Sequence, residues 1–302
     1  MGGAAPRAAA MNLLISLLAT TLSFATPITL GALCGVACER AGVVNIAIEG
    51  MMLAAAFGGY WAAVTLHSLP LAVLVAVAVG ASMAALHGML SITFRTDQIV
   101  SGTVINILGF GITSYLYGQW YARNAPLSPG TLPSVHVPGT SVAVQLLGLV
   151  APVLVVLLHG VLNDTPWGLR VRAVGEYPQA ADAVGVDVRR VRYGAVLAGG
   201  LLAGLGGASY VPGYLPAFTP GMTAGFGFIA LAAMIFGKWR PFGAWGAALF
   251  FGFTLALQIT LQSSRVPLDA RLIGALPYVA TLIVLAGFVG RATPPAADGV
   301  PY

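Results

Sequence analysis

The chain has 302 residues, of which 58% are hydrophobic and only 8% are charged, and its mean hydropathy is +0.89. These values exceed what the core of a soluble protein requires, so they exclude a soluble globular domain and predict an all-α fold, a polytopic bundle of transmembrane helices. The net charge of +5 lies in the connecting segments. It therefore informs topology, and we expect membrane lipid but no nucleic acid as a partner.

Nine apolar segments follow one another along the chain and predict about nine spans in a single transmembrane domain over residues 1–302. A straight span needs about 20 residues. The seventh segment is shorter, so we expect a half-helix or a tilted partner of its neighbour there. The segments are residues 13–37, 46–66, 70–93, 98–120, 143–160, 193–212, 223–237, 243–261 and 272–290.

The N-terminal segment has two interpretations. Arg7, the apolar run Leu13–Leu22 and the small residues around Ala25 resemble a signal peptide. We expect an uncleaved helix instead, because the apolar run continues past Ala25 to Cys38. Met11 is an alternative start of the chain.

The basic residues predict the orientation, because cytoplasmic connections carry an excess of lysine and arginine. Placing the loop of residues 163–192 in the cytoplasm puts ten of the 14 basic residues on that side. With nine crossings, the tail at 291–302 is then also cytoplasmic. The ten are Arg40, Arg95, Arg170, Arg172, Arg189, Arg190, Arg192, Lys238, Arg240 and Arg291, and the other four are Arg7, Arg123, Arg265 and Arg271.

The loop at 163–192 is the most polar part of the chain, and it contains a predicted short helix. Pro178 suits a first helical position, and Gly185 suits a helix stop, so we expect a helix near Pro178–Val184. Because lipid would reject such a segment, it must lie in water or against a polar partner.

Two motifs resemble a known family of permeases. The run Gly175-Glu-Tyr-Pro-Gln-Ala-Ala-Asp-Ala-Val-Gly-Val resembles the cytoplasmic loop of permease subunits in ATP-binding-cassette importers of the ribose, nucleoside and branched-chain amino acid group. The run Glu39-Arg-Ala-Gly-Val-Val-Asn-Ile-Ala-Ile-Glu-Gly resembles a signature of the nucleoside and simple-sugar branch. The similarity extends from about Leu13 to Val289 and includes Phe236-Gly-Lys-Trp-Arg-Pro-Phe-Gly243. Tyr177 departs from the family's usual Asn, and it cannot cap a helix as Asn does.

The resemblance implies a transmembrane permease subunit in the bacterial plasma (inner) membrane. It implies three partners: a separate ATPase subunit, an extracytoplasmic solute-binding protein, and a second permease subunit that is a different but related chain. The chain has no Gly-x-x-x-x-Gly-Lys-Ser/Thr loop, so we expect no enzymatic activity and no bound cofactor, with ATP and Mg on the partner ATPase. The residues expected to couple the chain to that ATPase are Gly175, Glu176, Tyr177, Pro178, Ala180, Ala181 and Gly185.

Polar and aromatic residues within apolar surroundings are candidates for the substrate path. Asn45 and Glu49 are four residues apart, which would place them on one helical face, and a carboxylate is costly in lipid. The alternative for this pair is a structural hydrogen bond, or a Glu39–Arg40 pair at a helix end. Asn106 could instead bond a neighbouring helix. Phe226 and Phe228 could stack on a nucleobase or belong to an interfacial aromatic belt.

Metal binding is not indicated by the sequence. Cys34 and Cys38 are four residues apart with no histidine nearby, so we interpret them as small core residues, and the four histidines are scattered.

Several functions remain open at this stage. An importer permease fits best, with nucleosides ahead of simple sugars and branched-chain amino acids third. In an ion-coupled secondary transporter, Glu49 would carry the coupling proton. A membrane-embedded enzyme would need a nucleophile, a base or a metal cluster, and the sequence offers no such constellation.

Overall fold

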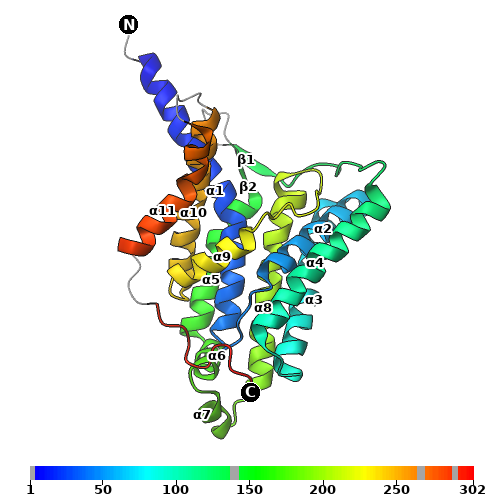
Figure 1. Cartoon of the computed structure of the whole chain (residues 1–302), viewed down its shortest axis with the longest axis vertical. Helices are drawn as coiled ribbons and strands as arrows, with labels where there is room; N and C mark the ends of the chain where they lie inside the picture. The colour runs from blue at the N-terminus through cyan, green and yellow to red at the C-terminus, as the bar shows by residue number, and fades with distance from the viewer. Residues whose placement is uncertain (1–3, 137–142, 264–268, 288–291) are drawn as a thin grey trace.

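The computed structural model describes residues 4–136, 143–263, 269–287 and 292–302. The chain is a bundle of helices with a single two-stranded hairpin in the described part (Figure 1). The N-terminus lies at one end of the bundle, and the C-terminus lies at the other, beside α6 and α8 (Figure 1). The elements are α1 (Ala4–Glu39), α2 (Ile48–Leu66), α3 (Leu69–Gly88), η1 (Met89–Thr93), α4 (Gln98–Tyr121), β1 (Ser134–His136), β2 (Ala143–Gln145), α5 (Leu146–Asp164), α6 (Pro166–Glu176), α7 (Pro178–Ala183), α8 (Val188–Ala208), η2 (Ser209–Tyr214), α9 (Phe226–Phe236), α10 (Pro241–Ser263) and α11 (Ala270–Gly287).

Each of the nine predicted apolar segments overlaps a helix, and the all-α bundle is confirmed. Residues 288–290 of the ninth segment lie outside the described residues. By length and composition, six helical stretches in the described residues are able to cross a membrane, so the count of nine spans is not confirmed. The six are Leu13–Glu39, Leu69–Thr93, Gln98–Tyr121, Leu146–Asp164, Val188–Tyr214 and Pro241–Ser263. The seventh segment forms the short helix α9, which agrees with the half-helix interpretation.

The start of the fifth predicted span is wrong. Residues 143–145 form strand β2, which pairs antiparallel with β1 through Val135 and Val144. Helix α5 begins only at Leu146, where the amide donates a hydrogen bond to Pro133. The strand ladder therefore takes the backbone groups that a longer helix would have used.

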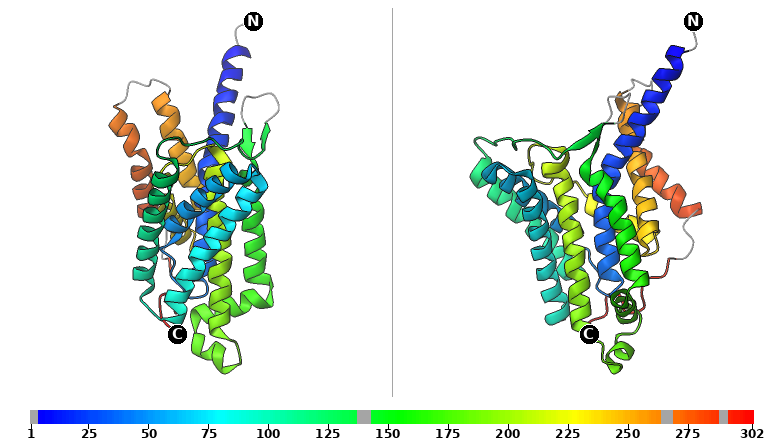
Figure 2. Two further views of the ribbon diagram at one scale, coloured as in Figure 1. Left: turned by 90° about the vertical axis from the view of Figure 1, so that its right-hand side faces the viewer. Right: turned by 180° about the vertical axis from the view of Figure 1, so that it is seen from behind.

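Helices α1 and α8 occupy the centre of the bundle. Figure 2 shows α2, α3 and α4 on one side of this pair and α5, α10 and α11 on the other. The close packing of α8 on α3 depends on small side chains, because Gly200 and Gly204 face the backbone of α3 directly.

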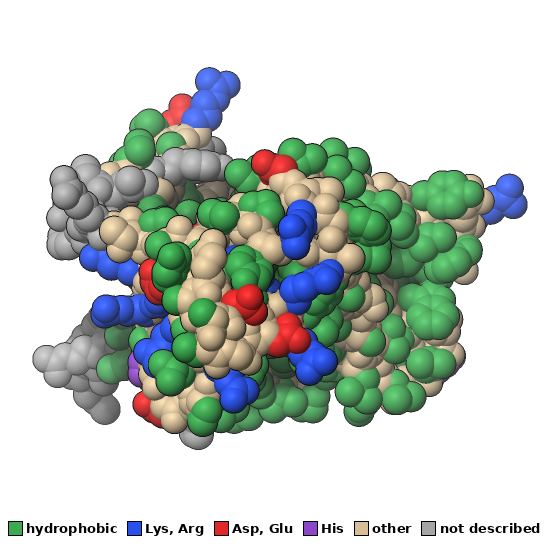
Figure 3. Space-filling model, turned by 90° about the horizontal axis from the view of Figure 1, so that it is seen from below, with side chains coloured by type: hydrophobic (Ala, Val, Ile, Leu, Met, Phe, Trp, Pro, Cys, Tyr) green, Lys and Arg blue, Asp and Glu red, His purple; other side chains and the backbone are tan. Residues whose placement is uncertain are grey.

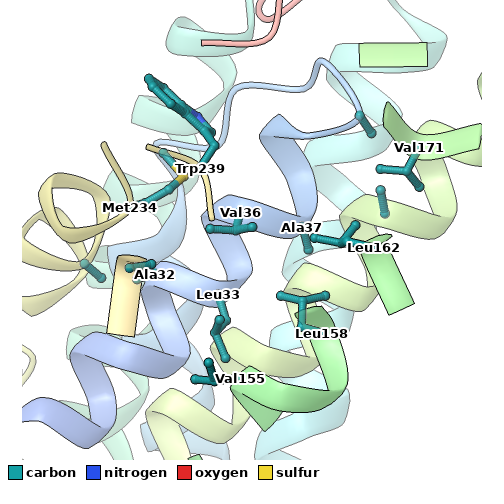
Figure 4. Packing of buried hydrophobic residues seen from close by; sticks show 14 of the residues in the cluster. Ala32, Leu33, Val36, Ala37, Val155, Leu158, Leu162, Val171, Met234 and Trp239 are labelled. Atoms are coloured by element: carbon teal, nitrogen blue, oxygen red, sulfur yellow. The ribbon is translucent and has the colours of Figure 1, made fainter. Parts of the chain in front are cut away.

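The main apolar core lies between α1, α5, α6 and the segment from α9 to α10. Figure 4 shows Ala37 of α1 beside Leu162 of α5, and Leu33 of α1 beside Leu158 of α5. Val171 of α6 belongs to the same cluster, so this amphipathic helix packs against the ends of the spanning helices.

Candidate functional site

The short helix expected in the polar loop is present as α7, with its bounds at Pro178–Ala183. Pro178 stands at its start, the Tyr177 side chain makes no cap, and Gly185 follows its end with a φ of +86°. Two exposed apolar side chains flank this helix: Tyr177 is 63% exposed and Val184 is 79% exposed. The tip of the segment therefore offers a small apolar surface at the end of the molecule (Figure 1).

The two alanines of α7 do not share a surface. Ala180 is exposed, whereas Ala181 is only 5% exposed and belongs to the core beneath the helix. Consecutive helical residues point about 100° apart, so only Ala180 of the two faces outward, and the predicted coupling role of both stays a prediction. Pro178 is also buried.

Gly175 anchors this segment to the rest of the bundle. A Cβ atom at this position would collide with the carbonyl of Arg40, which follows α1. The carbonyl oxygen of Gly175 accepts a hydrogen bond of 2.8 Å from the Ala297 amide of the C-terminal tail. The carboxylate of Glu176 accepts a second bond of 3.2 Å from Ala296. The polar loop is thus held by α1 on one side and by residues 292–302 on the other.

The carboxylate of Glu49 caps the short helix α9. One of its oxygens accepts hydrogen bonds from the Thr223 hydroxyl at 2.7 Å and from the Gly225 amide at 2.9 Å. The other oxygen accepts one from the Gly227 amide at 2.6 Å. These amides belong to the otherwise unpaired N-terminal turn of α9, where the helix dipole attracts negative charge.

Gly227 allows α2 and α9 to approach this closely. A Cβ atom on Gly227 would lie 2.5 Å from the Cα of Glu49, which is closer than van der Waals contact permits. In Figure 1, α9 lies between α11 on one side and α2 and α4 on the other. The capped end of a half-helix therefore lies inside the helix bundle, the arrangement by which membrane transporters build binding sites.

Asn106 on α4 completes the contact at the start of α2. Its side-chain oxygen accepts a hydrogen bond of 2.7 Å from the Gly50 amide, and its amide donates one of 2.9 Å to the carbonyl of Ile46. Asn106 thus binds backbone groups on both sides of Glu49. Both expected roles, helix bonding and a place near the path, remain compatible with this position.

Asn45 does not share a helical face with Glu49, so that part of the prediction is wrong. Helix α2 begins at Ile48, and Asn45 lies in the turn before it. Asn45 is fully buried, where its side-chain oxygen accepts a bond from the Ala47 amide at 3.1 Å. Its side-chain amide lies against the sulfur atoms of Cys34 and Cys38. This turn geometry is the local alternative to a helix that asparagine favours.

The two phenylalanines of α9 point in different directions. Phe226 is partly buried against Phe24 and Tyr210, with ring centroids 6.2 and 6.0 Å apart. Phe228 is 50% exposed and lines a groove of about 350 Å³ between α9, α10 and α11. Gln258 and Thr254 of α10 also line this groove. The structure therefore places Glu49 and Phe226 at the start of α9 and Asn106 against the start of α2, whereas Asn45 lies in the core and Phe228 faces outward.

Trp239 is a structural residue that our sequence reasoning missed. Its indole N–H donates a hydrogen bond of 2.6 Å to Glu39, and its carbonyl accepts one of 2.8 Å from Arg40. Glu39 and Arg40 thus both bond Trp239, and the alternative of a Glu39–Arg40 pair is not among the ion pairs of the described residues. The available signal was the motif at residues 236–243, in which Trp239 is the fourth residue.

Metal ligation has no support in the described residues, where no group of three or more His, Cys, Asp or Glu side chains lies close enough to hold an ion. Cys34 and Cys38 are both buried and free, which confirms that they are core residues.

The fold and this arrangement define a multi-pass membrane protein with a half-helix inside its bundle and a polar helical segment at one end. The family described as "Branched-chain amino acid transport system / permease component" matches residues 17–285, so the chain belongs to this family of permeases. No solved structure matches the chain.

Three relatives resemble the chain over most of its length. The "Guanosine ABC transporter permease protein NupQ" of Bacillus subtilis is 40% identical over 97% of this chain and 98% of its own. The "Nucleoside ABC transporter permease protein NupC" of Lactococcus lactis is 37% identical over 97% and 98%. The "Putative glucose ABC transporter permease protein TsgC13" of Haloferax volcanii is 37% identical over 90% and 87%. The chain is also 24% identical to the permease NupB of L. lactis, over 76% of this chain and 69% of NupB.

Proposed function

We propose that the chain is the permease subunit of an ATP-driven importer of nucleosides. The observation that carries this proposal is the similarity of 37–40% over nearly the whole length to permeases named for guanosine and nucleosides. The motif from Glu39 to Gly50, which resembles the nucleoside and simple-sugar branch, agrees with it.

The cap on α9 favours an uncharged cargo. Half-helix N-termini in transporters bind anionic groups such as the carboxylate of an amino acid. In this chain, the Gly225 and Gly227 amides already bind the carboxylate of Glu49. A second carboxylate at this site would be repelled by the first. Nucleosides and simple sugars carry no such charge, so this geometry ranks both above branched-chain amino acids.

The partners follow from the same family. Relatives of this chain have paired names, NupQ with NupP and NupC with NupB, which supports a second, related permease in the assembly. A separate ATPase would bind ATP and Mg and would receive α7 in a groove. An extracytoplasmic solute-binding protein would deliver the cargo and provide most of the selectivity. The C-terminus, which lies at the same end as α6 and α7, would then face the cytoplasm at the inner membrane.

The test is uptake by the complete transporter reconstituted in vesicles with ATP inside. Uptake of a labelled nucleoside should be competed by several purine and pyrimidine nucleosides and not by ribose or leucine. Competition by ribose alone would move the cargo to the sugar branch, and competition by leucine alone would move it to amino acids. Uptake that follows a proton gradient and needs no ATP would contradict the importer mechanism.

A sugar importer is the second candidate, because a relative at 37% identity is named for glucose. Glucose competition in the same vesicles distinguishes the two.

A further inference from the structure

A basic cavity lies at the end of the bundle that carries α6 and α7, between the ends of α1, α5 and α10. Its volume is about 300 Å³, and Arg40, Arg172 and Arg240 line it together with His159 and Asn163. In the described part of the chain, no aspartate or glutamate lines this cavity. Figure 3 shows lysine and arginine side chains gathered on this end of the molecule.

Among the described residues, the guanidinium groups of Arg40 and Arg172 make few hydrogen bonds. Arg40 donates one hydrogen bond to the carbonyl of Trp239, and Arg172 reaches Asn163 only at 3.5 Å. The Nε of Arg172 is buried and finds no partner in the part of the chain that the structure describes. Burial lowers the pKa of Arg40, Glu176 opposes this shift, and the positive charges of Arg240 and Arg172 lower the pKa further. An anion in the cavity would relieve this repulsion and bind the unpaired donors.

The cavity opens beside apolar surface that suits acyl chains. Val156 lies one turn before His159 on the same side of α5 and is 57% exposed. Phe242 at the start of α10 is also exposed, and its ring lies 4.8 Å from the ring of His159. Both α5 and α10 are long and apolar enough to span a membrane. Positive charge at a helix end thus adjoins a lipid-facing surface.

We propose that this cavity binds the phosphate of an anionic phospholipid from the leaflet next to α6 and α7. Arginine forks match phosphate oxygens, and basic pockets at the ends of transmembrane helices bind anionic headgroups in this way. An acidic segment of the ATPase is the less favoured occupant, because α7 contributes no residue to the cavity and the adjoining surface is apolar. The site does not depend on which solute the chain transports.

The test is native mass spectrometry of the full chain purified in detergent. Phosphatidylglycerol and phosphatidylcholine with identical acyl chains are added, and inorganic phosphate is added in a third arm. Wild type should retain phosphatidylglycerol in preference to phosphatidylcholine, and excess inorganic phosphate should not displace it. The double variant R172Q/R240Q should bind phosphatidylglycerol about tenfold or more weakly, since each basic residue near the surface contributes to attraction.

The control is R170Q, which removes one positive charge from α6, the helix of Arg172, at a position that does not line the cavity. It should bind phosphatidylglycerol as wild type does. Equal weakening by R170Q, no lipid preference in wild type, or complete displacement by inorganic phosphate would each overturn the proposal. So would a double variant that binds phosphatidylglycerol as tightly as wild type. If the double variant does not fold, the single variant R240Q replaces it in the lipid-binding measurement, because Arg240 is exposed.

Discussion

Glu49 holds α2 and α9 together through three hydrogen bonds, and its replacement should therefore destabilise the bundle. E49Q keeps one acceptor oxygen but loses the charge that the α9 dipole attracts, so we expect a loss of about 2 kcal/mol. E49A leaves the Gly225 and Gly227 amides unpaired and should lose more. Thermal unfolding of the purified protein in detergent measures both variants.

The control for Glu49 is E176Q, because Glu176 is exposed and accepts a single bond, of 3.2 Å, from the described part of the tail. It should unfold close to the wild-type temperature. An E49A protein as stable as wild type would show that the cap contributes little. An E49Q protein that is stable yet inactive in uptake would assign the charge to the transport path instead.

At the scale of single residues, the sequence predicted that Glu49 needed a polar partner but not which one. A carboxylate in an apolar stretch is costly, and that cost is visible in the composition. Its partners are Thr223 and two backbone amides 176 and 178 positions away in the chain. Backbone amides have no signal in a sequence, so only the fold could show them. Asn45 was wrongly predicted to share a helical face with Glu49, because the sequence does not show that α2 begins only at Ile48.

Helix α7 should act as the contact with the ATPase through its exposed side. A180R places a long charged side chain on that side without entering the core, and we expect ATP-driven uptake to fall about tenfold or more. Membrane insertion and assembly with the second permease should be retained. Co-purification of the ATPase, measured with uptake, checks the variant.

T293R is the control for A180R, since Thr293 is exposed on the C-terminal tail and lies outside α7. It should support normal uptake. Normal coupling in A180R would remove α7 from the ATPase contact. A181R is unsuitable for this purpose, because Ala181 is buried and its replacement would disrupt the core.

The C-terminal tail should dock on the bundle in a pH-dependent manner. Burial raises the pKa of Asp298 from 3.8 to about 8, the Glu39 carboxyl beside it adds to the shift, and Arg192 opposes it. The docked tail therefore binds a proton that a free tail releases. Because the raised pKa belongs to the docked state, docking is strongest at low pH and weakens as the pH rises from about 4 to about 8, by at most tenfold per unit.

Hydrogen exchange at the Ala297 amide, corrected for its intrinsic pH dependence, measures this docking through the bond to Gly175. Protection should decline toward pH 8 in wild type and stay constant in D298N. D187N, which changes an exposed acid at the same end, should behave as wild type. Protection that rises with pH would contradict the assignment of Asp298.

At the scale of elements, the sequence predicted α7 within one residue and the short α9 well. Pro178 and Gly185 are strong local signals for a helix start and stop. The tail contact was not predictable, because it joins residues 296–298 to Gly175, Glu176 and Glu39 through backbone groups and a buried carboxyl. The hairpin of β1 and β2 was missed because its strands have three residues each.

At the scale of the whole molecule, the family and the helical class followed from composition and two motifs, whereas the number of spans did not. Counting spans from apolar runs treats every run as a straight crossing. Helix α9 has 11 residues, too few to cross, and α2 falls outside the six stretches that meet the length and apolarity of a span. Packing between helices lets such segments lie inside the bundle without reaching both surfaces.

The groove of α9, α10 and α11 should face the second permease, because a path that releases its cargo is best built between two subunits that move against each other. Phe228 lies half exposed beside the polar side chains of Gln258 and Thr254, in a position to line such a path.

Cys34 and Cys38 are fully buried, so a thiol introduced at position 228 would be the accessible one. F228C should cross-link to the second permease in the assembled transporter, and a nucleoside should slow the reaction by occupying the path. V153C on the exposed side of α5 is the matched control and should form no such link, since the residues that line the groove come from α9, α10 and α11 and not from α5. A cross-link from V153C in place of F228C would move the subunit interface, and with it the path, to the α5 side.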